Sequence, residues 1–136
     1  VDSENTKEIK RYWKSGEFNR TNFTKGWMIP HPTFFVSKEI YNTFGLYNLS
    51  LKSASDYEMI LRLLYKHKVS VSYFPEVIVH MRDGGYSNQN IWSRLRGNNE
   101  DLKAWELNGI KSPKFLRLRK PLSKLSQFIK RPKDNE

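Results

Sequence analysis

Asp56 has the residue type and the local sequence of a proton acceptor. It belongs to Ser55-Asp56-Tyr57-Glu58, in which Ser55 and Glu58 have the spacing of a capping box at the start of a helix. The positive end of a helix favours a charged carboxylate, which can then take a proton from a hydroxyl group. The structural alternative is that Asp56 only stabilises the first turn of that helix.

His31 is the second candidate, because Pro30 and Pro32 flank it and hold it in an extended loop. Its imidazole could hydrogen-bond a sugar hydroxyl or a phosphate, or bind a metal ion. The alternative is a loop histidine with one structural hydrogen bond. His80, in a predicted strand, has no carboxylate at a spacing typical of a metal site. His67 is expected only to complement the C-terminal end of its helix.

The turn Gly84-Gly85-Tyr86-Ser87 could offer backbone N–H groups to an anion. It lacks the Lys and the following helix of a phosphate-binding loop, so the first interpretation is a tight turn. The sequence has no Cys, no His-Glu-x-x-His, no Gly-x-Gly-x-x-Gly and no nucleophile elbow. Nothing in it therefore supports a Cys nucleophile or an autonomous hydrolase, protease or NTPase.

The elements expected to position these residues alternate between helices and strands. Apolar residues at helical spacing predict helices, and β-favouring or alternating segments predict strands. The expected helices are 6–15, 38–44, 56–67 and 88–108, and the expected strands are 33–36, 69–74 and 76–82. In the helix over 56–67, Arg62 is placed to pair with Glu58. The pattern predicts an α/β protein.

Length and charge limit the protein classes that need to be considered. The 136 residues suffice for one domain or part of a larger one, and no apolar run approaches the ~20 residues that span a bilayer. The polar, acidic first residues do not resemble a signal peptide, and the absence of an initiator Met suggests a processed or excised start. The net charge is +10, of which residues 111–136 hold +7 and residues 1–110 hold +3. Because a nucleic-acid surface would spread its charge over the fold, no nucleic-acid partner is predicted.

The basic segment after Pro113 has the pattern of an amphipathic helix. Large apolar residues fall at helical spacing among Lys and Arg, namely Phe115, Leu118, Leu122, Leu125 and Ile129. The chain could then be a non-enzymatic basic module that binds an anionic membrane surface through residues 111–133. The structural alternative is a solvated helix packed on the domain. We therefore divide the chain into a portion over 1–110 and a basic tail over 111–136.

The order of several short motifs resembles a known family. They are Met28 to Val36 (MIPHPTFFV), Phe44-Gly45-Leu46-Tyr47, Ala54 to Glu58 (ASDYE), Tyr73-Phe74-Pro75-Glu76 and Arg82 to Ser87 (RDGGYS). Together they are similar to the C-terminal half of a family 2 glycosyltransferase with the GT-A fold. The resemblance covers residues 26–88 well and the tail hardly at all. It implies one half of a mixed sheet with flanking helices, incomplete without a nucleotide-binding half.

The resemblance also implies an activity and a set of roles. Family members transfer a sugar from a nucleotide-sugar donor to an acceptor hydroxyl, here a glycan or a lipid-linked acceptor in polysaccharide or cell-surface glycan synthesis. Asp56 matches the catalytic base of an inverting transfer. His31 and Thr33 match the acceptor side, and Arg82, Gly84 and Gly85 match the loop that closes over the diphosphate.

One part of the family pattern is missing from this sequence. No Asp-x-Asp motif, which would hold Mg²⁺ or Mn²⁺ against the diphosphate, occurs in the 136 residues. The resemblance therefore implies that donor site and metal ligands lie in a longer parent enzyme, and that this chain alone binds no metal and is inactive. It further implies a cytoplasmic protein, peripheral to the inner membrane face. A half-fold with exposed sheet edges also predicts a homodimer.

Overall fold

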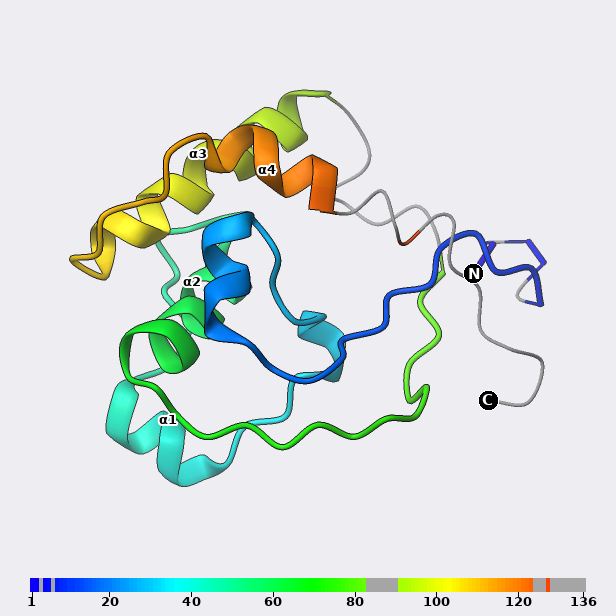
Figure 1. Cartoon of the computed structure of the whole chain (residues 1–136), viewed down its shortest axis with the longest axis horizontal. Helices are drawn as coiled ribbons and strands as arrows, with labels where there is room; N and C mark the ends of the chain where they lie inside the picture. The colour runs from blue at the N-terminus through cyan, green and yellow to red at the C-terminus, as the bar shows by residue number, and fades with distance from the viewer. Residues whose placement is uncertain (3, 6, 83–90, 124–126, 128–136) are drawn as a thin grey trace.

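The computed structural model describes residues 1–2, 4–5, 7–82, 91–123 and 127, and helices joined by long irregular segments make up this part (Figure 1). Two 3₁₀ turns, η1 (Arg20–Lys25) and η2 (His31–Thr33), precede helix α1 (Lys38–Phe44). Helix α2 (Ser55–Ile60) continues directly into a π-helical segment, η3 (Leu61–Lys66). Helices α3 (Ile91–Leu107) and α4 (Leu116–Ser123) complete the fold.

The predicted α/β fold, with half of a GT-A-type mixed sheet, is wrong for the described residues, because they contain no β-strand. Segments 69–74 and 76–82 are extended but lie against no neighbouring strand, and Phe74 is 59% exposed. An alternating pattern needs a partner strand to become a sheet. In the predicted strand 33–36, Thr33 instead closes the 3₁₀ turn η2 by donating its backbone N–H to the Pro30 carbonyl.

The predicted helix over 6–15 is also wrong. Residues 7–10 form a turn with bends, in which the Glu8 N–H donates to the Asn5 carbonyl at 3.0 Å, and residues 11–15 form no helix. The Tyr12 N–H donates to the Gln127 carbonyl at 2.9 Å. The Arg11 guanidinium donates to the side-chain oxygen of the same glutamine, with Nε at 2.6 Å. Because an isolated helix shorter than about 12 residues is marginal in water, these contacts with the tail outweigh the helical spacing of three apolar residues.

The other helices are confirmed within a few residues of their predicted bounds: α1, the continuous α2–η3 segment, and α3. The predicted capping box is not formed. Ser55 lies inside α2, Ala54 precedes it as the N-cap, and no side chain caps the turn. Six residues of α2 and η3 are at most 2% exposed, namely Tyr57, Met59, Ile60, Leu61, Leu63 and Leu64. This helix is therefore apolar around most of its circumference and forms the centre of the molecule.

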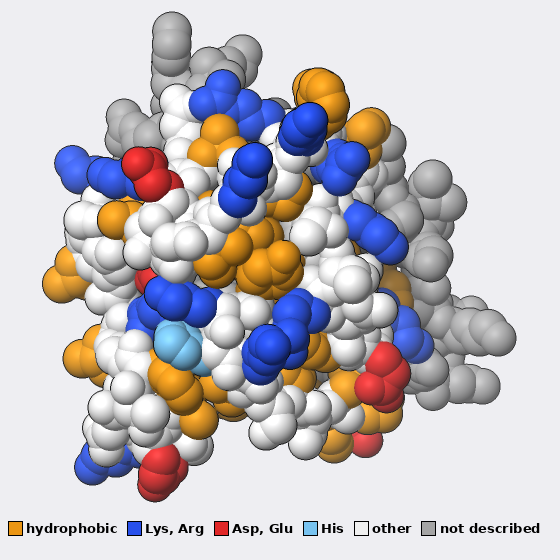
Figure 2. Space-filling model, turned by 60° about the vertical axis from the view of Figure 1, so that its left-hand side comes forward, with side chains coloured by type: hydrophobic (Ala, Val, Ile, Leu, Met, Phe, Trp, Pro, Cys, Tyr) orange, Lys and Arg blue, Asp and Glu red, His pale blue; other side chains and the backbone are white. Residues whose placement is uncertain are grey.

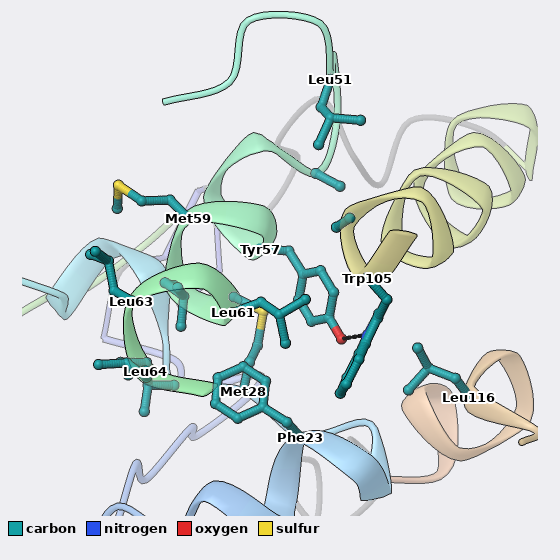
Figure 3. Close-up of a cluster of buried hydrophobic side chains, with 14 residues drawn as sticks. Phe23, Met28, Leu51, Tyr57, Met59, Leu61, Leu63, Leu64, Trp105 and Leu116 are labelled. Carbon is teal, nitrogen blue, oxygen red and sulfur yellow. Dashed lines mark hydrogen bonds between the residues drawn. The ribbon is translucent and has the colours of Figure 1, made fainter. Parts of the chain in front are cut away.

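The core is completed by side chains from elements far apart in the sequence (Figure 3). Phe23 of η1 and Trp105 of α3 lie beside the α2–η3 segment, and Leu116 of α4 lies beyond Trp105. Buried Trp105 donates its indole N–H to the Tyr57 hydroxyl at 2.9 Å. Burial, and then the negative charge of Asp101, raise the pKa of Tyr57 well above its ordinary value.

The helices lie apart from the N-terminal end of the chain. Helices α3 and α4 lie along one side of the molecule, whereas α1 lies at the opposite side (Figure 1). Residues 69–82 run away from the helices toward the N-terminus, where the Val1 amino group donates to the Met81 carbonyl at 2.7 Å. Among the described helices, none combines the length and the apolar character that crossing a bilayer requires.

Candidate functional site

The structure brings Asp56 and His31 into direct contact. Turn η2 packs against α2, and this places His31 Nδ1 at 3.1 Å from Asp56 Oδ2. The Asp56 side chain is 29% exposed and the His31 side chain is 49% exposed, so the pair lies at the surface within reach of solvent. The two leading sequence candidates therefore form one site.

The contact fixes which nitrogen of His31 is the donor. A carboxylate oxygen only accepts hydrogen bonds, so Nδ1 carries the hydrogen that is shared with Asp56. In the neutral ring Nε2 is then the acceptor nitrogen. On the Asp56 side, Oδ2 is used by the histidine, and Oδ1 remains as the second acceptor of a partly exposed carboxylate.

Two tyrosines lie beside this pair. The Tyr41 and Tyr47 rings are 6.4 Å apart and inclined by 35°. The pKa of Tyr47 is raised by burial, then by Tyr41, which also hydrogen-bonds it, and then by the negative charge of Asp56. Tyr47 is still 45% exposed, so the phenol ring can meet a ligand. The sequence analysis gave neither tyrosine a role in the site. The signal available in the sequence was a tyrosine on each side of the turn at Gly45.

Arg62 holds the loop that carries Tyr47. Its guanidinium donates to the carbonyls of Phe44, Gly45 at 3.1 Å and Leu46 at 2.7 Å. These carbonyls lie at the C-terminal end of α1, where helix groups lack intrahelical partners. Gly45 has φ of +86°, and a Cβ at this position would meet Arg62 Nη1 at 3.4 Å. Glycine is therefore favoured both by the backbone conformation and by the close approach of the guanidinium.

The predicted pair of Glu58 and Arg62 is confirmed, with Arg62 Nε at 2.9 Å from Glu58 Oε1. It belongs to a larger network than the sequence indicated, because Asn108, which directly follows α3, also donates its side-chain amide to Glu58 Oε1 at 3.0 Å. Only 4% of the Glu58 side chain is exposed. The network thus joins α2, α3 and the end of α1 directly beneath the loop that carries Tyr47.

The remaining predicted site residues are not joined to this pair. Thr33 lies in the same turn as His31, but its hydroxyl donates to the Pro30 carbonyl at 3.0 Å. Arg82 is exposed and directly follows Met81, whose carbonyl accepts from the Val1 amino group. Gly84 and Gly85 lie outside the described residues. A shallow groove of about 550 Å³ between α3 and residues 110–112 contains neither Asp56 nor His31.

No group of three or more His, Asp or Glu side chains that could hold a metal ion occurs in the part of the chain that the structure describes. The resemblance places the ligands of Mg²⁺ or Mn²⁺ in a part of the parent enzyme outside this sequence, and that expectation stays a prediction. Comparison with models of protein families, with curated proteins and with solved structures finds no match to this chain.

Proposed function

We propose that Asp56 and His31 form the acceptor side of a sugar-transfer site. The observation that carries the proposal is the 3.1 Å contact between His31 Nδ1 and Asp56 Oδ2. These residues are distant in the sequence, and the sequence resemblance alone assigned both to one site. The proposal depends on this pair and not on the predicted sheet, which the described residues do not form.

In the proposed reaction, the oxygen of an acceptor hydroxyl attacks the anomeric carbon of a nucleotide sugar. The new glycosidic C–O bond forms as the bond to the nucleotide diphosphate breaks, and the hydroxyl proton passes to the Asp56 carboxylate. The donated N–H of His31 holds Oδ2 and orients the carboxylate, so that Oδ1 can accept the proton. Attack from the face opposite the leaving group inverts the anomeric centre.

The two tyrosines support a sugar as the acceptor. A pyranose ring has an apolar C–H face that packs against aromatic rings, and Tyr47 offers a half-exposed ring beside the proposed base. The acceptor is then a glycan or a lipid-linked glycan. The proposed contact of Arg82, Gly84 and Gly85 with the donor diphosphate stays a prediction.

The test is sugar transfer by the full-length enzyme that contains this chain, with a panel of UDP-, GDP- and dTDP-sugars as donors. Asp56→Asn keeps the size and the hydrogen bonds of the side chain but removes its basicity. We expect turnover to fall by about 10²–10⁴-fold, the usual contribution of a general base. The matched control, Glu106→Gln on the exposed face of α3, should turn over normally. Undiminished turnover in Asp56→Asn would reject the base assignment.

A second measurement addresses the acceptor. Tyr47→Ala removes the exposed ring but leaves Asp56 and His31 in place. We expect KM for the acceptor glycan to rise by about 10-fold, with a smaller change in kcat, because stacking binds the acceptor before and during transfer alike. A fall in kcat with unchanged KM would instead place Tyr47 in the chemical step.

A further inference from the structure

Helix α4 carries an apolar stripe that faces solvent. Leu118 and Leu122 lie one turn apart on α4, and Phe115 directly precedes the helix with a φ of +61°. The three side chains, here called the apolar stripe, are 63%, 63% and 69% exposed. Leu116, on another side of the same helix, is only 2% exposed and packs into the core. The sequence predicted an amphipathic helix here, and the structure shows that its larger apolar stripe lies on the outer side.

The orientation of α4 is fixed by contacts other than this stripe. Arg119 Nη1 donates to the Thr24 carbonyl at 3.2 Å, and the Ser123 hydroxyl donates to the Gly26 carbonyl at 3.3 Å. Arg117 Nη2 donates to the Asn99 side-chain oxygen of α3 at 2.8 Å. Turning the stripe inward would break all three bonds and expose Leu116. The folded chain therefore holds three large apolar side chains in water.

The stripe lies among positive charges. Lys111, Lys114, Arg117 and Arg119 are all exposed. The two arginines bond to neutral oxygens, so these contacts cancel none of their charge. Residues 111–136 contain nine Lys or Arg and two Asp or Glu. Elsewhere too, Lys and Arg side chains lie among hydrophobic ones, as the face of the molecule drawn in Figure 2 shows.

We propose that this face of α4 binds an anionic lipid membrane surface, with Phe115, Leu118 and Leu122 inserted among the headgroups. Apolar residues on one side of a helix and Lys or Arg around them are the properties that place a helix in the plane of a charged bilayer. The inference is independent of the proposed sugar transfer, because no residue of the Asp56 site takes part.

Two other occupants fit these observations less well. A nucleic acid would neutralise the basic side chains but would leave the three apolar side chains exposed to water. A second copy of the chain would bring two equally basic tails together. Three side chains also supply far less contact than the roughly 800 Å² per partner of a typical stable interface.

The experiment is co-sedimentation of the full chain with vesicles at ~0.15 M salt, either neutral (phosphatidylcholine) or with about one third anionic phosphatidylserine. We expect binding to anionic vesicles and at least about tenfold weaker binding to neutral ones. Leu118→Ser with Leu122→Ser should weaken anionic binding at least about tenfold. Lys111→Gln with Lys114→Gln should weaken it by a similar factor, at about 1 kcal/mol for each basic residue.

Matched controls use equally exposed residues outside the tail. Phe35→Ser with Leu49→Ser removes side chains that are 80% and 89% exposed, and Lys38→Gln with Lys52→Gln removes two exposed charges. Both controls should bind vesicles like the wild type. All substituted residues are exposed, so we expect unchanged circular dichroism.

Several results would overturn the proposal. One is vesicle binding that survives the double leucine substitution. Another is displacement from vesicles by ~10 mM inorganic phosphate at constant ionic strength, which would assign the site to a phosphate group alone. A third is a lipid-free dimer or an oligonucleotide complex that the leucine substitutions abolish, which would assign the stripe to that partner.

Discussion

Asp56 and Glu58 are two carboxylates in one helical turn, and their surroundings give them different properties. The Glu58 side chain is 4% exposed and has Arg62 at 2.9 Å and Asn108 at 3.0 Å. The Asp56 side chain is 29% exposed and has His31 at 3.1 Å. One carboxylate is enclosed by hydrogen-bond donors, whereas the other keeps a solvent-accessible side.

The comparison separates a structural pair from a pair available for chemistry. A buried carboxylate with a guanidinium and an amide on its oxygens has no room for a substrate, and its loss leaves an uncompensated charge. A partly exposed carboxylate that is oriented by one histidine can still receive a hydrogen bond from a ligand. Two acidic residues that look equivalent in the sequence are thus distinguished by which neighbours the fold supplies.

Breaking the buried pair should give the largest effect. Arg62→Met keeps the apolar stem but leaves Glu58 as an unpaired buried charge and frees the carbonyls at the end of α1. We expect the free energy of unfolding to fall by about 3–5 kcal/mol in urea denaturation. Lys66→Met, an exposed change in the same helical segment, should stay within about 0.5 kcal/mol. A loss below about 1 kcal/mol for Arg62→Met would show that the pair is not enclosed.

Tyr57 lies between Asp56 and Glu58 in the sequence, and its substitution tests the buried core. Tyr57→Phe removes the oxygen that accepts the buried Trp105 N–H at 2.9 Å. An unsatisfied buried donor costs about 1–3 kcal/mol, so we expect that loss in the free energy of unfolding at pH 7. Stability unchanged by the substitution would mean that the indole N–H finds another acceptor.

The same residue predicts a pH dependence. Burial and the nearby Asp101 raise the pKa of Tyr57 in the folded protein, so the unfolded chain loses this proton at a lower pH than the folded one. Protonated Tyr57 therefore contributes fully to the free energy of unfolding below the ordinary tyrosine pKa of about 10. This contribution is lost as the pH rises above that value. Between pH 9 and about 11, wild-type stability should therefore fall more steeply than that of Tyr57→Phe. Parallel curves would contradict the assignment.

A helix could be predicted from the sequence where the apolar residues on one of its faces are buried in the core. The spacing of Met59, Ile60, Leu63 and Leu64 indicated the central helix, and the structure buries all four. The segment 69–82 has an equally regular pattern, yet it forms no strand, because pairing depends on a neighbour that local spacing does not specify. Local periodicity thus predicts a helix or strand correctly only when the fold supplies the core or the neighbouring strand against which it packs.

In the candidate site, too, the sequence pattern does not specify which residues become neighbours in the fold. Residue types and the resemblance singled out Asp56 and His31, and their contact was a consequence of packing between η2 and α2. Tyr47 was missed because its position depends on Arg62 holding the loop at the end of α1. The i, i+4 spacing predicted that Arg62 pairs with Glu58, but it gave no sign of the three carbonyls that share the guanidinium.

Replacing the exposed carboxylate should change stability far less than breaking the buried pair. Asp56→Asn keeps a hydrogen-bond acceptor toward His31 and leaves no buried charge. We expect the free energy of unfolding to change by less than about 1 kcal/mol, the usual range for an exposed ion pair. A loss comparable to that of Arg62→Met would assign Asp56 a structural role and would weaken its proposed role as a base.

Double-mutant cycles measure the coupling energy within each of the two pairs directly. One cycle combines Asp56→Asn with His31→Gln, and the other combines Glu58→Gln with Arg62→Met. For the exposed pair we expect a coupling energy of about 0.2–1 kcal/mol that decreases when salt rises from ~0.05 to ~0.5 M, because solvent and ions screen it. For the buried pair we expect a larger coupling that salt hardly changes, because its charges lie out of reach of ions. Equal couplings with equal salt dependence would mean that the two carboxylates occupy similar environments, and the distinction between a structural and a chemical pair would then be lost.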